Sequence, residues 1–144
     1  MTNSMRAVYR FWARLIFVAV IVQVAAAGYG AFYAAHKVGE KPKETLTNKQ
    51  WDHGFGFHGI LGSMIFLAGV LLFLFALAGR FDRKRVLLAL ALPVLVFVQI
   101  LLAIIGGSVP AVGALHGANA LVVVGFAAYL AREAHRQTWM ATSS

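Results

Sequence analysis

Two histidines, His58 and His116, stand near the start of long apolar runs, and each is followed directly by a glycine. Each of these runs comes after another apolar run that carries a single glutamine, Gln23 in one case and Gln99 in the other. An ionisable imidazole inside an apolar helix is costly unless it binds something. Two imidazoles at matching depths can hold one flat ligand between them, which indicates axial ligation of a porphyrin iron.

The elements that must position these residues are membrane-spanning helices. The chain has 144 residues, of which 60% are hydrophobic and only five are Asp or Glu, a composition that excludes an ordinary soluble domain. A spanning helix needs about 20 apolar residues. Four runs meet this requirement, at about 11–35, 54–79, 86–106 and 111–131. They predict an all-α, integral membrane four-helix bundle that forms a single transmembrane domain over residues 1–144.

The distribution of charge predicts the orientation of these spans. Nine basic residues flank the ends that share one side of the membrane: Arg6, Arg10, Arg14, Arg80, Arg83, Lys84, Arg85, Arg132 and Arg136. The other side has four, which are Lys37, Lys41, Lys43 and Lys49, beside three acidic residues. Because basic short loops stay cytoplasmic, we expect both termini inside, in a bacterial cytoplasmic (inner) membrane. The net charge of +8 is then explained by this orientation and by attraction to anionic membrane lipid. No nucleic acid is expected as a partner.

The order of glutamine and histidine along the chain indicates a repeat. Gly30 follows Gln23 by seven positions, and Gly106 follows Gln99 by the same interval. The repeated unit is a helical hairpin with Gln on the outward-going helix and His at the start of the returning one. The first hairpin is expected to have a long hydrophilic outer loop, at about 36–53, and the second a tight turn. Both hairpins then run the same way across the membrane.

This arrangement places His58 and His116 at nearly equal depth, in the outer leaflet. Small residues beside them would leave room for the edge of a macrocycle; these are Gly59, Gly62, Gly117, Ala118 and Ala120. We therefore expect one heme b per chain, with the two histidines as its iron ligands. The alternative is that the histidines are hydrogen-bonded polar residues in a packed helix interface, where small residues are also favoured.

Other polar residues have several candidate roles. Gln23 and Gln99 can bond to each other, to a carbonyl or to a quinone head. His53 is expected at the outer interface, where it can meet a heme propionate or a quinol, or simply belong to a solvated loop. The four outer lysines are on the correct side to neutralise propionates. The chain has no cysteine, and no acidic residue is expected inside the spans, so a closed zinc or copper site is not predicted.

The layout of Gln23, His58, Gln99 and His116 resembles one four-helix half of the heme A synthase family, and also small bacterial four-helix membrane proteins of the same design. The resemblance covers residues 11–131 and implies that His58 and His116 are heme ligands. The family's usual pattern has an acidic residue three positions before the first of these histidines and an arginine directly after it. Phe55 and Gly59 occupy those positions here. The resemblance therefore implies the fold and the heme ligands rather than the synthase reaction.

With both axial positions occupied by imidazole, the iron has no open site, so electron transfer is the expected role. We predict a small b-type cytochrome that passes electrons between the quinone pool and an outer-face partner, or that serves as a subunit of a redox complex. An electron carrier or subunit is favoured over a free-standing enzyme, and the partners are other membrane or redox subunits or a second copy. The alternatives are a non-redox membrane scaffold or assembly subunit, and a heme-handling protein in which heme is cargo.

Overall fold

The computed structural model describes residues 2–41 and 44–142, with side chains described for 4–41 and 44–134. The described residues form four α-helices and no strand: α1 (Thr2–Glu40), α2 (Asn48–Ala78), α3 (Arg83–Gly106) and α4 (Pro110–Thr142). Each contains a candidate membrane span, respectively Ser4–Glu40, Asn48–Ala78, Arg83–Gly106 and Pro110–Ala134. The predicted four-helix, multi-pass membrane fold is confirmed at this level. Lys43 and Arg136, which belong to the charge argument above, lie outside the described side chains.

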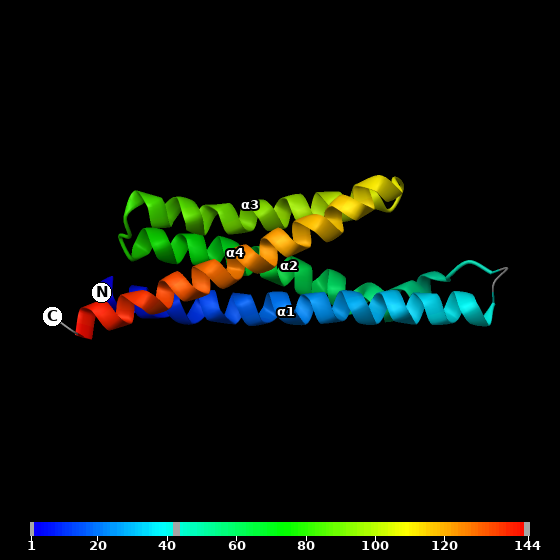
Figure 1. The fold of residues 1–144 in the computed structure, drawn as a ribbon, viewed down its shortest axis with the longest axis horizontal. Coiled ribbons are helices and arrows are strands. Elements are labelled where there is room, and N and C mark those ends of the chain that lie inside the picture. Colours follow the sequence, from blue (N-terminus) through cyan, green and yellow to red (C-terminus); the bar gives the residue numbers. More distant parts are fainter. Residues whose placement is uncertain (1, 42–43, 143–144) are drawn as a thin grey trace.

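The helices form a closed ring in which each packs against two others. Within the described part of the chain, α1 packs on α2 and α4, and α3 packs on the same two helices. The pairs α1–α3 and α2–α4 therefore face each other diagonally. Figure 1 shows α1 and α2 as one long pair, and shows α3 and α4 diverging from that pair towards the α3–α4 turn.

On every helix, the buried core residues are spaced three or four positions apart. Tyr9, Ala13, Ile16 and Val20 form its stripe on α1, and the stripes on α2, α3 and α4 centre on Leu72, Leu92 and Ala127. This spacing places the residues of each stripe on one face of the helix, so the four faces meet along the bundle axis. We call the end of the bundle with the α1–α2 and α3–α4 connections the outer end, after the orientation expected from the sequence. Val20 on α1 and Val96 on α3 end these stripes on the side towards this end, and the two glutamines come one turn further along.

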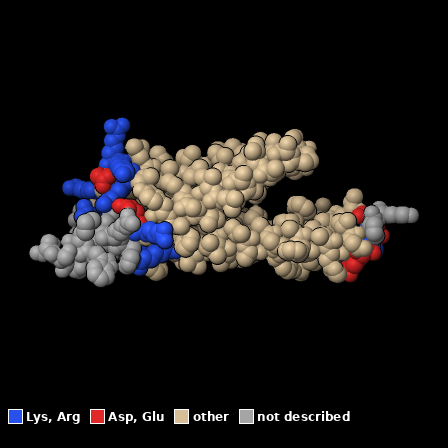
Figure 2. All heavy atoms as spheres, in the orientation of Figure 1, with Lys and Arg blue, Asp and Glu red and all other residues tan. Residues whose placement is uncertain are grey.

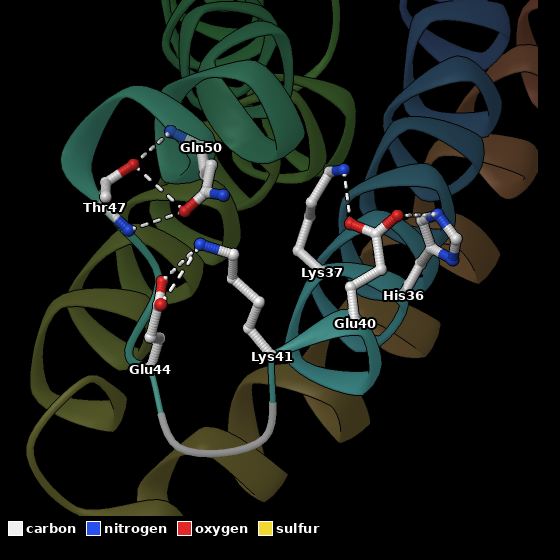
Figure 3. Close-up of polar contacts among 7 residues, drawn as sticks. All are labelled: His36, Lys37, Glu40, Lys41, Glu44, Thr47 and Gln50. Carbon is white, nitrogen blue, oxygen red and sulfur yellow. Dashed lines mark hydrogen bonds and ion pairs between the residues drawn. The ribbon is translucent and has the colours of Figure 1, made fainter.

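The outer loop is shorter than predicted. The prediction of a loop over 36–53 is wrong in extent, because α1 continues to Glu40 and α2 already begins at Asn48. Two local interactions stabilise these polar helix ends (Figure 3). The Lys37 ammonium pairs with Glu40 at 2.7 Å, and Thr47 with Gln50 forms a reciprocal capping box at the start of α2.

The surface has the pattern of a protein solvated by lipid. Large apolar side chains are exposed on all four helices, with Phe32, Ile104 and Leu121 at 81%, 68% and 74%. Figure 2 shows a broad band without Lys, Arg, Asp or Glu in the middle of the visible face. Lys and Arg gather at the end that holds the α2–α3 turn. Exposed apolar area of this extent is unfavourable in water and favourable in a bilayer.

Two close helix contacts set the geometry of the outer half. A Cβ added at Gly30 on α1 would lie 2.7 Å from the carbonyl oxygen of Gly54 on α2 and 2.5 Å from the Phe55 ring. On the other pair, a Cβ at Gly106 would lie 2.7 Å from the Cα of Gly113. Glycine at these positions lets the backbones approach closely, so each histidine lies beside the glutamine of its neighbouring helix.

Candidate functional site

The side chains of His58 on α2 and Gln23 on α1 each donate a hydrogen bond to the main-chain carbonyl of the other residue. The His58 Nδ1 donates to the carbonyl oxygen of Gln23 at 3.2 Å, and the Gln23 side-chain amide donates to the carbonyl oxygen of His58 at 2.8 Å. Since a carbonyl can only accept, Nδ1 carries the proton and Nε2 keeps its lone pair. The ring of His58 is thus oriented with its unprotonated nitrogen available to a metal.

His116 on α4 and Gln99 on α3 repeat the same two contacts. The His116 Nδ1 donates to the carbonyl oxygen of Gln99 at 3.0 Å, and the Gln99 amide donates to the carbonyl oxygen of His116 at 2.9 Å. Here a third residue takes part, because the Asn119 amide donates to the Gln99 Oε1 at 2.6 Å and to the carbonyl oxygen of Leu95 at 3.3 Å. His116 therefore also has a protonated Nδ1 and an Nε2 with a free lone pair.

The two imidazoles meet across the bundle axis. Their helices, α2 and α4, are diagonal in the ring of helices, and the ring centroids lie 6.3 Å apart with an interplanar angle of 69°. Both rings line a cavity of about 310 Å³, whose walls are otherwise mainly aliphatic, including Val20, Val24, Ala27, Val96, Ile100 and Ala103. The site is an apolar chamber lined by two imidazole rings, and both glutamines lie in its wall.

The small residues predicted beside the histidines line this cavity, with one exception. Gly59, Gly62, Gly117 and Ala120 are in its wall, whereas Ala118 is exposed elsewhere on α4. A Cβ added at Gly59 or Gly117 would meet no atom of the described structure within 4 Å. Both glycines therefore border open space, as expected where a bulky ligand edge is to be accommodated.

His53 lies outside the cavity, in an exposed aromatic cluster at the outer end of α1 and α2. The Tyr29 hydroxyl is 3.2 Å from the His53 Nε2, and the Tyr33 ring centroid is 4.8 Å from that of His53. Tyr29 and Tyr33 are stacked, with centroids 6.1 Å apart. We call Tyr29, Tyr33 and His53 the outer aromatic cluster; it comes together because Gly30 and Gly54 let the two helices touch.

Two of the lysines expected to neutralise propionates already have partners. Lys37 pairs with Glu40, and Lys41 pairs with Glu44 at 3.0 Å (Figure 3). His36, also at this end, lies 3.3 Å from Glu40. These groups stabilise the outer helix ends, and none of them lines the cavity.

Sequence reasoning missed three polar contributors, Asn119, Ser63 and Tyr29. Asn119 lies three positions after His116, a spacing that shares a helix face, so its position was a usable signal. Ser63 lines the cavity and donates its hydroxyl to the Gly59 carbonyl at 3.1 Å.

Over the described residues, no group of three or more His, Cys, Asp or Glu side chains comes together as a metal site.

Comparison with known proteins gives one partial likeness. Residues 47–107 match the model of a family of unknown function (DUF6220). The matched segment spans α2 and α3, and so includes His58 and Gln99 but neither of their partners on the other two helices. No curated protein and no solved structure matches the chain. The site thus defines a class, a four-helix multi-pass membrane protein with an opposed histidine pair, and the function must be argued from that site.

Proposed function

We propose that the protein is a membrane-embedded b-type cytochrome that holds one heme b between His58 and His116. The observation that carries the proposal is the pair of imidazoles, each with its Nδ1 proton fixed on a backbone carbonyl, so that each Nε2 has a lone pair that can bind a metal. The nearest polar contact of the His58 Nε2 is a long one, 3.5 Å from the Gln23 amide nitrogen. A second group that fixes the tautomer and orientation of a ligating histidine is the usual companion of metal ligation.

The spacing of the rings fits one metal between them. With metal–nitrogen bonds of about 2.0 Å, two imidazoles on opposite sides of one ion have ring centres about 6 Å apart. The observed separation of the two ring centroids, 6.3 Å, agrees with this value. The donor set also fits, because two neutral imidazoles without further ligands suit an iron whose other four positions are filled by a macrocycle.

The cavity supplies the surroundings that a macrocycle needs. Its walls are aliphatic, and the open space at Gly59 and Gly117 leaves room beside both ligands. When bound, heme supplies one-electron redox chemistry, which suits electron transfer because both axial positions are taken. The chain itself orients the ligands through Gln23 and Gln99 and limits the access of water through its aliphatic walls. The proposed role is that of an electron carrier or a subunit of a redox complex.

The chain is proposed to consist of two repeated hairpins, α1–α2 and α3–α4, with both termini in the cytoplasm of a bacterial cell. The reciprocal Gln–His contacts recur once in each hairpin, which supports the repeat. The concentration of Lys and Arg at the end with the α2–α3 turn (Figure 2) supports the orientation in the cytoplasmic membrane. The histidine pair then lies in the outer leaflet. The earlier likeness to one half of a heme A synthase is consistent with this proposal.

The absence of cysteine from the chain allows a direct test of this orientation. Single cysteines placed at Thr45 and Ser108, in the two outer connections, should react with a membrane-impermeant maleimide on intact cells. A cysteine at Ser4 should react only after the membrane is permeabilised. The reverse pattern would show that the termini face outwards, and the site would then lie in the cytoplasmic leaflet.

The outer aromatic cluster is the proposed entry point for electrons from a quinol. His53 precedes His58 by five residues, about 7.5 Å along the helix axis, so the cluster lies close to the proposed heme. Oxidation of a quinol to a quinone releases two electrons and two protons. The His53 imidazole, 3.2 Å from the Tyr29 hydroxyl, can accept one proton from a quinol hydroxyl, and because His53 is exposed the second proton can pass to water. The two electrons would leave in single steps to the heme and then to a one-electron acceptor at the outer face.

Replacement of His53 by alanine should slow heme reduction by duroquinol by about 10²-fold, since a positioned general base contributes at least that much. The rate is measured by stopped-flow absorption, with dithionite reduction of the same sample as a control for intact heme. The matched control is His36→Ala, which removes a neighbouring outer histidine that pairs with Glu40. Equal duroquinol rates in His53→Ala and the parent protein would exclude the cluster as the quinol site.

A further inference from the structure

The two halves of the cavity match position by position. Counted from the glutamine, Ala27 corresponds to Ala103, and both line the cavity; counted from the histidine, Gly59 corresponds to Gly117 and Ile65 to Val123. Two polar correspondences fail. Asn119 follows His116 by three positions, whereas Leu61 follows His58 by three. Ser63 follows His58 by five positions, whereas Leu121 follows His116 by five, and Ser63 donates to the Gly59 carbonyl of its own helix. The site is thus two-fold in shape, and the polar difference that contacts a glutamine is Asn119.

On the His116 side this residue completes the hydrogen bonding of the glutamine. The Gln99 amide nitrogen donates to the His116 carbonyl and its Oε1 accepts from Asn119, which itself also donates to Leu95. Both ends of the Gln99 side chain are therefore fixed between α3 and α4. The carbonyl that receives the His116 Nδ1 proton belongs to this same fixed residue.

On the His58 side the corresponding bond is missing. The Gln23 Oε1 is buried, and it has no hydrogen-bond partner among the described residues. Leu61 offers an apolar side chain at the place where Asn119 offers an amide. A buried acceptor without a partner is unfavourable, so this half is held less firmly than the other.

The backbone differs in the same direction. Around His58, α2 carries Gly54, Gly56, Gly59 and Gly62. Each glycine inside a helix weakens it relative to alanine. A Cβ added at Gly56 or Gly59 would meet nothing within 4 Å in the described structure, whereas Gly54 and Gly62 lie against Tyr33 and Gln23 of α1.

From this asymmetry we propose that His116 is the fixed iron ligand and His58 the exchangeable one, so that the reduced heme binds a small neutral diatomic ligand in place of His58. The Gln23 amide nitrogen, 3.5 Å from the His58 Nε2, then lies beside the vacated position and can donate to the bound ligand. This inference rests on the proposed heme and adds a ligand site to the cytochrome. A small neutral ligand suits this position because the walls of the cavity are mainly aliphatic.

Carbon monoxide is the probe, added to the dithionite-reduced holoprotein and followed by stopped-flow absorption. We expect a carbon monoxide complex in the parent protein, and at least a tenfold slower association in Leu61→Asn, which offers Gln23 the partner that Gln99 has. Leu61→Ala, which removes the side chain without adding an amide, should not slow association. Asn119→Leu should add a second, faster phase, because it loosens the other ligand.

The outcomes separate this inference from the proposed function. A protein that purifies folded but without heme contradicts the proposed function itself. A protein with its full heme content that does not react with carbon monoxide overturns only the exchangeable ligand. Association rates that Leu61→Asn leaves unchanged, in a variant whose heme content and reduced α band match the parent, also overturn it, because His58 would then not be the ligand displaced.

Discussion

Replacement of either histidine by alanine is expected to abolish the low-spin b-type spectrum of the protein. His116→Ala removes the ligand that the Gln99–Asn119 network fixes, and we expect heme affinity to fall at least about 100-fold, because even outer-shell changes at metal sites cost 10–100-fold. His58→Ala removes the second axial ligand, so any heme that is retained should become high-spin. Heme content per chain and the reduced absorption spectrum measure both effects.

His36→Ala serves as the control for these variants. His36 is at the outer end of α1, pairs with Glu40 and does not line the cavity, so its loss should leave the heme content unchanged. If His58→Ala and His116→Ala both kept the parent spectrum, the two imidazoles would be hydrogen-bonding groups in a helix interface. The function would then be that of a membrane scaffold.

The second large effect is expected from filling the cavity. Gly117→Leu and Gly59→Leu place a side chain in open space, since an added Cβ meets nothing within 4 Å in the described structure. Heme should be excluded from both variants, while the heme-free protein should become more stable by about 0.5–1 kcal/mol, because leucine favours a helix more than glycine does. A lower heme content together with a higher thermal stability would show that heme is excluded, whereas a misfolded variant would lose both heme and stability.

Gly125→Leu provides the matched control on the same helix. A Cβ at Gly125 also meets nothing within 4 Å in the described structure, but this residue does not line the cavity. The substitution should raise the helix stability equally and leave the heme content unchanged. Full heme content in Gly117→Leu and Gly59→Leu would show that the ligand does not occupy the chamber between the histidines.

Much of the architecture follows from local patterns in the sequence. The number of spans was predictable from hydropathy alone, because a bilayer demands about 20 apolar residues per helix. From the sequence, only a similar depth in the membrane could be predicted for Gln23 and His58, and likewise for Gln99 and His116. Which atoms meet depends on the close approach of α1 to α2 and of α3 to α4 at Gly30 and Gly106, and single-helix periodicity does not report such contacts.

Other features depend on tertiary placement. Asn119 is a single polar residue in an apolar run, and its role appears only once the Gln99 Oε1 lies 2.6 Å away. His53 was expected at the interface, near a propionate or a quinol or in a solvated loop; its contacts with Tyr29 and Tyr33, outside the cavity, depend on the Gly30–Gly54 approach of α1 to α2. The length of the outer loop was overestimated because hydropathy marks the end of the apolar run. The capping box at Thr47 and Gln50 marks the true start of α2.

A b-type cytochrome requires heme in the chamber between His58 and His116. The most direct test is a dithionite-reduced minus oxidised absorption spectrum of the purified protein in detergent, with a pyridine hemochrome assay on the same sample. We expect a sharp low-spin b-type α band and about one heme per chain, as bis-histidine ligation requires. Heme that is lost readily during purification would indicate cargo rather than a resident cofactor. A featureless spectrum from well-folded protein would contradict the cytochrome.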